Sequence, residues 1–234
     1  MKCRALALLL LLCCLPFVVR AHGTLVDLSV YDRTDGRRLP VYWHAGRAYI
    51  VGKPGNEYQV SVRNQQREEV LAVVSVDGVN VVSGETADPR QTGYVLTPGS
   101  SYDILGWRKS LAETAAFYFT ALADSYAART GRPDNVGVIG VAVFRKKREP
   151  QAIAPAAPQE EARLGTGHGR RENSPVREVA FERAAPSPVE TVTLYYESYR
   201  NLVARGVIPP SPPIAPGPQP FPGAFSTFAP DPPG

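Results

Sequence analysis

The sequence predicts a mainly-β protein, a β-sandwich of the immunoglobulin-like or jelly-roll-like kind. Short runs that alternate apolar with polar residues follow one another between residues 25 and 147. Turn-forming Gly, Pro, Asn and Asp separate these runs at close intervals. Little of the segment has the period of an amphipathic helix. About 120 residues are enough for one domain of this class.

Three strand-like runs open the domain, at residues 25–31, 47–51 and 58–62. Asp-Gly and Pro-Gly dipeptides follow the first two runs, and each dipeptide is typical of a turn. Clean alternation in the third run places Tyr58, Val60 and Val62 on one face of a strand.

A hairpin is predicted where two β-branched runs, 69–76 and 79–82, meet at Asp77-Gly78. A two-residue loop of this composition favours a type I′ turn, in which both central residues have positive φ. Gly takes that conformation freely and Asp tolerates it. Asp77 therefore has a structural explanation, which we weigh above a catalytic one.

Four further strands complete the predicted sandwich, at residues 93–97, 101–107, 115–121 and 136–145. Gly137 and Gly140 lie in the last of them, where glycine is typical of a bulge or a close backbone approach. Between the last two strands, residues 124–129 favour a single helical turn that Asp124 caps and Gly131 ends.

The composition changes near residue 148, because six of the 23 prolines precede this point and seventeen follow it. We therefore divide the chain after the sandwich domain (22–147) into a disordered linker (148–164), a C-terminal extension (165–208) and a disordered proline-rich tail (209–234). The extension contains two strand-like runs, 176–184 and 191–197, and a helical run, 198–205. Such a strand-strand-helix fragment is too small to fold alone, so we expect it to dock on the sandwich and add strands to an edge.

The first 21 residues are typical of a cleaved secretion signal, with basic Lys2 and Arg4, an apolar stretch and a small-residue cleavage motif ending at Ala21. The apolar stretch is shorter than the about 20 residues that a membrane-spanning helix needs. Cleavage after Ala21 removes all three cysteines, at positions 3, 13 and 14. An alternative is acylation at Cys13 or Cys14, although leucines rather than small residues precede Cys13. The chain is expected in the periplasm or the medium, with no transmembrane span after cleavage.

The net charge of +4 does not indicate nucleic-acid binding. Three of the basic residues, Lys2, Arg4 and Arg20, leave with the signal, so the predicted mature protein carries +1. No sequence signature of an RNA- or DNA-binding fold accompanies the charge.

Three stretches together resemble a family of exported bacterial proteins of unknown function: Ser75–Val81 (SVDGVNV), Arg129–Gly140 (RTGRPDNVGVIG) and Gly165–Glu172 (GTGHGRRE). The resemblance covers most of residues 25–208 and leaves out the proline-rich tail. It implies that the sandwich and the 165–208 segment belong together, and it implies no catalytic residue and no substrate.

A copper site is the sharpest chemical hypothesis from the residues. Cleavage after Ala21 exposes His22, whose α-amine and imidazole suit copper(II) when a second histidine completes a three-nitrogen set. His44 and His168 are the available partners. An N-terminal His-Gly on a secreted sandwich is similar to copper-dependent polysaccharide monooxygenases and to periplasmic copper-binding sandwiches. The alternative is a solvated terminal histidine without a metal.

The remaining candidates have plain structural explanations. The loop 165–172 combines a histidine with arginines and could serve acid–base chemistry or anion binding, but its glycines also suit a hinge. Tyr42, Trp43 and Tyr49 could stack on a sugar, or pack in the sandwich. No nucleophile motif and no paired carboxylates of a glycosidase are present. We therefore expect an exported, non-enzymatic binding or structural module of the bacterial cell envelope without a cofactor, whose partner is unknown. The alternative is a copper-binding or copper-dependent oxidative protein.

Overall fold

The computed structural model describes residues 21–147 and 171–210, and these residues form a mainly-β protein with two sheets. This confirms the predicted mainly-β class. The predicted linker lies outside the described residues, as do residues 1–20 of the signal, 165–170 of the extension and 211–234 of the tail. No helix of the described part is long and apolar enough to cross a membrane.

Up to residue 147 most strands of the described part overlap predicted runs, whereas the short strands at residues 21–22, 37–38 and 42–44 were not predicted. The strands are β1 (Ala21–His22), β2 (Val26–Asp32), β3 (Arg37–Arg38), β4 (Tyr42–His44), β5 (Arg47–Val51), β6 (Glu57–Asn64), β7 (Val70–Val76), β8 (Val79–Asn80), β9 (Tyr94–Leu96), β10 (Ser101–Ile104), β11 (Gly106–Arg108), β12 (Glu113–Tyr118), β13 (Val138–Arg145), β14 (Arg171–Asn173) and β15 (Glu190–Glu197). The helices are α1 (Tyr126–Arg129), α2 (Tyr199–Ala204) and the 3-10 turns η1 (Leu122–Asp124) and η2 (Pro133–Asn135).

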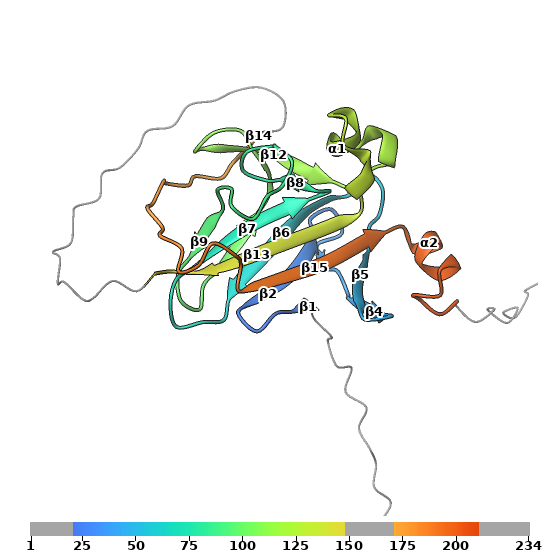
Figure 1. Ribbon diagram of the computed structural model, residues 1–234. Coiled ribbons are helices and arrows are strands. Elements are labelled where there is room, and N and C mark those ends of the chain that lie inside the picture. Colours follow the sequence, from blue (N-terminus) through green and yellow to red (C-terminus); the bar gives the residue numbers. More distant parts are fainter. Residues whose placement is uncertain (1–20, 148–170, 211–234) are drawn as a thin grey trace, which may run out of the picture.

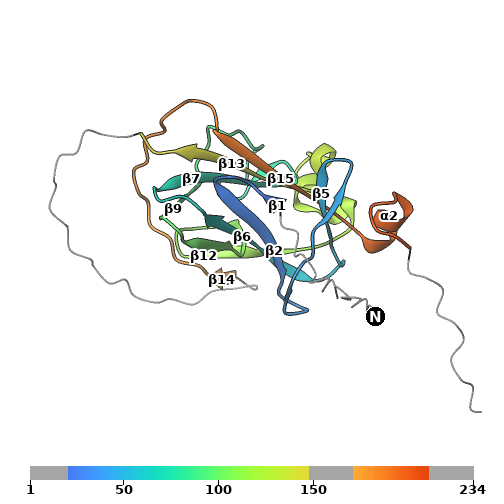
Figure 2. The same ribbon diagram turned by 90° about the horizontal axis from the view of Figure 1, so that it is seen from below.

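The two sheets, as far as the chain is described, have eight and seven strands. The first has the order β1-β2-β6-β12-β11, with β3 on β2, β10 on β6 and β14 on β12. The second has the order β4-β5-β15-β13-β7-β8, with β9 on β7. Figure 2 places β13 and β15 in one layer and β12 and β14 in the other. The connection from β12 to β13, which contains η1, α1 and η2, passes from the first sheet to the second at one end of the molecule (Figure 1).

One apolar core joins the two sheets. Tyr58, Val60 and Val62 of β6 are buried, whereas Gln59 and Ser61 between them are half-buried, as the alternation of this strand predicts. They belong to the same buried cluster as residues of the second sheet such as Ile50, Val74, Ile139, Val141 and Leu194. The packing of the two inner faces therefore creates the interior of the protein.

Two tight hairpin turns have the same backbone geometry. Asp77 and Gly78 have φ of 54° and 71° and join the paired residues Val76 and Val79, which confirms the predicted type I′ turn. A second turn of this kind joins β4 to β5 through Ala45 and Gly46, whose φ values are 47° and 74°. We did not predict it, because Ala-Gly is not among the dipeptides typical of such a turn.

The C-terminal strand lies inside a sheet and not at an edge, contrary to our expectation. β15 pairs antiparallel with β13 and parallel with β5, so that it separates the β4–β5 hairpin from the rest of the second sheet. After β15, α2 and the residues that follow it pack on the outer face of this sheet, where Leu202, Val207 and Ile208 form a small cluster with Tyr49. β15 takes this interior position because β13 on one side and β5 on the other both have backbone groups that need hydrogen-bond partners.

Three local predictions need correction. Residues 176–184 are not a strand. Val176 and Phe181 contact two different apolar clusters, and the backbone bonds of the segment go to Leu111 at one end and Arg145 at the other, so no continuous ladder forms. The predicted strand 101–107 is divided into β10 and β11, which pair with different strands. The cap of the helical turn is Ser125, whose hydroxyl accepts from the Ala128 amide, and not Asp124, which ends η1.

Candidate functional site

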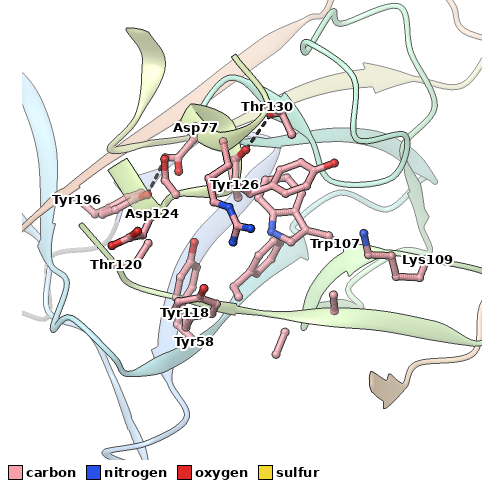
Figure 3. A pocket seen from close by; sticks show the side chains of 16 residues that line it. Tyr58, Asp77, Trp107, Lys109, Tyr118, Thr120, Asp124, Tyr126, Thr130 and Tyr196 are labelled. Atoms are coloured by element: carbon pink, nitrogen blue, oxygen red, sulfur yellow. Dashed lines mark hydrogen bonds between the residues drawn. The ribbon is translucent and has the colours of Figure 1, made fainter. Parts of the chain in front are cut away.

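A cavity of about 400 Å³ lies at the end of the molecule where the chain crosses from one sheet to the other. Both sheets line it, and the η1–α1 segment supplies a further wall (Figure 3). The lining residues are Tyr58, Val76, Asp77, Trp107, Lys109, Ala115, Ala116, Phe117, Tyr118, Thr120, Asp124, Ser125, Tyr126, Arg129, Thr130 and Tyr196. Its volume is in the range of sites that hold small molecules. We call it the interlayer pocket.

Asp77 is brought to the interlayer pocket by the turn that ends β7. Its backbone follows the type I′ geometry, and its residue is only 5% exposed. Oδ1 of the carboxylate accepts a hydrogen bond from the Tyr196 hydroxyl at 2.6 Å and another from the Gly137 amide at 2.8 Å. The turn, the start of β13 and the C-terminal strand are therefore held together at one carboxylate.

Two tyrosines form the inner end of the interlayer pocket. Tyr58 of β6 stacks on Phe119, with ring centroids 4.2 Å apart and planes 17° apart. Tyr196 of β15 packs against the same phenylalanine at 5.4 Å. The ring centroids of Tyr58 and Tyr196 are 6.5 Å apart. The aromatic packing fixes the direction of both hydroxyls, because rings packed on several sides cannot turn freely.

Burial raises the pKa of three groups in this part of the interlayer pocket. It raises the pKa of the Asp77 carboxyl above its ordinary value, while the hydrogen bonds from Tyr196 and Gly137 offset part of the rise. Burial also raises the pKa of both the Tyr58 and the Tyr196 hydroxyl, and the nearby Asp77 charge adds to the rise in each case. Both phenols are thus neutral at physiological pH, and each can donate a hydrogen bond.

An aromatic pair from two different elements lines the outer part of the interlayer pocket. Trp107 of β11 lies 4.7 Å from Tyr126 of α1, measured between ring centroids, and contacts Phe117 edge-on at 5.1 Å. The ammonium of Lys109 lies 5.7 Å from the centroid of the Tyr126 ring. Extended backbone from β11 into the next residue, Lys109, explains why these side chains meet. Trp107 and Lys109 line the pocket, whereas the Arg108 guanidinium between them bonds Ser174.

The interlayer pocket therefore presents four kinds of groups to a ligand. Carboxylates accept hydrogen bonds, neutral phenols donate and accept them, and aromatic rings offer apolar faces. Lys109 and Arg129 add positive charge. Hydrogen bonding and stacking are what this arrangement can supply.

The structure does not test the predicted copper site, because one of its three histidines lies outside the described residues. His22 lies on β1 in the first sheet, the exposed His44 lies on β4 at the end of the second sheet, and His168 falls outside the described residues. In the described ranges, no group of three or more His, Cys, Asp or Glu side chains could hold a metal ion. The copper site stays a prediction.

The candidate loop 165–172 is described only from Arg171 onward. β14 pairs with β12, and Glu172 accepts two hydrogen bonds from the Arg33 guanidinium, at 2.7 Å and 2.6 Å.

Of the proposed sugar-stacking aromatics, Tyr49 is buried, Tyr42 is half-buried and Trp43 is half exposed. They belong to the β4–β5 hairpin and do not line the interlayer pocket.

Sequence reasoning missed most of the pocket residues. It identified Asp77 only as a turn residue, and it placed Tyr58 and Tyr196 only within strand-like runs. Trp107, Lys109 and Tyr126 carry no local motif at all. One signal was available: Tyr58 and Tyr196 are polar-tipped residues at core positions, and buried phenols usually have a hydrogen-bond partner.

Comparison with known proteins adds no relative: no protein-family model, no curated protein and no solved structure matches the chain.

Proposed function

We propose that this chain is an exported, non-enzymatic binding module of the bacterial cell envelope or extracellular space, and that the interlayer pocket is its ligand site. The scaffold in this proposal is a β-sandwich of the immunoglobulin-like or jelly-roll-like kind, supported by the core that its two sheets share. Export is supported by the composition of residues 1–21.

One observation carries the binding role: the interlayer pocket combines the Trp107–Tyr126 pair with the Asp77–Tyr196 hydrogen bond. Small-molecule sites are mostly apolar cavities with a few polar groups that orient the ligand. The two features come from four separate elements, so the fold has to be complete before the site exists. A preformed site of this kind reduces the entropy cost of binding.

The proposal can be tested with the tryptophan of the pocket as a reporter. The chain has two tryptophans, so the substitution Trp43→Phe leaves Trp107 as the only one. A panel of neutral, amino and acidic sugars should contain at least one class that changes Trp107 emission in a saturable manner. Mass spectrometry of that sugar after long incubation should show no conversion, because the module is non-enzymatic.

Two tyrosine variants separate pocket binding from general effects. Tyr126→Leu in the W43F protein should weaken binding by about tenfold, because a stacking face is lost. Tyr31→Leu, at an exposed position on β2 away from the pocket lining, should leave affinity unchanged. If no sugar changes Trp107 emission, or if the bound sugar is chemically converted, the proposal is wrong.

A further inference from the structure

Lys109 lies away from the acidic groups of the interlayer pocket. Figure 3 shows Asp77, Asp124 and Tyr196 together on one side and Lys109 on the opposite side. The rings of Trp107 and Tyr126 lie between these two sides. A ligand that fills the pocket therefore meets hydrogen-bond acceptors at one end, an apolar face in the middle and a cation at the other end.

The basic groups of the interlayer pocket are available to a ligand. Lys109 and Arg129 are both exposed, and neither forms an ion pair with a residue of the described ranges. Lys109 is held near the pocket by its position over the Tyr126 ring, a cation–π arrangement. Arg129 is the last residue of α1, the same short helix that carries Tyr126.

The acidic end of the interlayer pocket contains the carboxylates of Asp77 and Asp124. The Asp77 carboxylate is buried and already accepts hydrogen bonds from Tyr196 and Gly137, whereas Asp124 is exposed at the end of η1. Ionised carboxylates only accept hydrogen bonds, so this end suits hydroxyl donors and repels a ligand carboxylate. Thr120, next to it, adds a hydroxyl.

We propose, on the basis of the proposed function, that the ligand is an acidic saccharide, a pyranose that carries a carboxylate. Its hydroxyls bond the acidic end, its C–H face packs on the Trp107–Tyr126 pair, and its carboxylate lies against Lys109. A neutral sugar satisfies the first two contacts only. A cationic sugar can pair with Asp124 but leaves Lys109 without an anion.

Matched pairs of sugars test the proposal in the W43F protein. Glucuronic acid and galacturonic acid, and their short oligomers, are titrated against glucose, galactose and the corresponding neutral oligomers. Each pair differs only in a carboxylate or a hydroxymethyl group. We expect the acidic member to bind at least tenfold more tightly, as a hydrogen bond to a charged group allows, and added salt should reduce this preference.

The variant Lys109→Gln should lower affinity for the acidic sugars about tenfold and affinity for the neutral sugars by a smaller factor, so that the preference for the acidic member of each pair is lost. Lys146→Gln, at a lysine that pairs with Glu69 outside the pocket lining, serves as the matched control and should change neither. Circular dichroism and melting temperature confirm that each variant is folded.

Four outcomes overturn the inference. Equal binding of both members of each pair, or tighter binding of glucosamine than of the acids, means that the basic end does not select the ligand, while the proposed binding function stands. An unchanged acidic preference in the Lys109→Gln protein has the same meaning. Absence of saturable binding by any of these sugars contradicts both the inference and the proposed function.

Discussion

Asp77 is constrained by its backbone and by its side chain for separate reasons. The backbone has φ of 54°, a conformation that few residues other than Gly, Asn and Asp adopt readily. The carboxylate binds Tyr196, which is 119 residues away in the sequence. The turn alone would accept Gly or Asn here, whereas the buried hydrogen bonds require an acceptor. The two requirements together favour Asp or Asn over every other residue.

Replacing Asp77 with Asn should change how stability depends on pH. The folded-state pKa of Asp77 is raised above its ordinary value of 3.8, so the folded protein favours the protonated form. The stability that the raised pKa of Asp77 contributes is fully present below the unfolded-state pKa and is lost as pH rises through the folded-state pKa. The Asn variant has no such group. Its stability relative to the wild type should therefore rise as pH increases from about 4, and then level off. Urea unfolding from pH 3.5 to 8 measures this difference, and a constant or falling difference would contradict the assignment.

At the scale of elements, the two type I′ hairpins differ in their surroundings. At Gly46 a β-carbon would meet no heavy atom within 4 Å. At Gly78 it would lie 2.8 Å from the β-carbon of Asn135, which ends η2. Both glycines have positive φ, so both resist substitution on conformational grounds. Only the β7–β8 turn is also packed against another element of the fold.

The pair Gly46→Ala and Gly78→Ala separates these two contributions. Gly46→Ala should cost about 1 kcal/mol of unfolding free energy, because alanine is strained at positive φ. Gly78→Ala should cost about 2–3 kcal/mol, because the contact with Asn135 adds to that strain. Thermal or urea unfolding of the two variants checks the order. If both lose the same stability, Asn135 does not pack against the β7–β8 turn.

At the scale of the molecule, local sequence predicted most of the strands before residue 147 and did not predict their partners. Alternation in β6 and the Asp-Gly turn after β7 are encoded within a few residues, so they could be inferred without a structure. The interior place of β15 depends on β5 and β13, which are distant in sequence and share no motif with it. The interlayer pocket depends on the same long-range pairing, because Asp77 meets Tyr196 only once β15 has entered the sheet.

The C-terminal segment is tied to the rest of the molecule at both ends of β15. At its start, the Glu190 carboxylate accepts hydrogen bonds from the backbone amides of Thr24, Leu25 and Val26, at 2.9 Å and 3.2 Å for the last two. At its other end, the ladder to β5 runs to Glu197. The first and last parts of the described chain thus depend on each other for their backbone hydrogen bonds.

A backbone cut between residues 148 and 164 should therefore leave the two parts associated. The buried apolar side chains of the described C-terminal part are Val192, Leu194, Leu202, Val207 and Ile208. Burying such residues contributes about 1.5–3 kcal/mol each, a total comparable with the stability of a whole domain. A site for a specific protease placed at residues 155–160 allows the cut to be made in the folded protein.

After cleavage the fragments should co-elute on a native sizing column and separate only in denaturant. The matched control carries the same protease site at residues 211–216 and should release its C-terminal fragment on the native column, since the sequence predicts a disordered proline-rich tail there. A chain ended at residue 148 should fail to fold, because β5 and β13 lose the strand that joins them. If the 165–208 part separates from the cleaved protein under native conditions, β15 does not hold the second sheet together. The interlayer pocket, which needs Tyr196, would then have to form in another way.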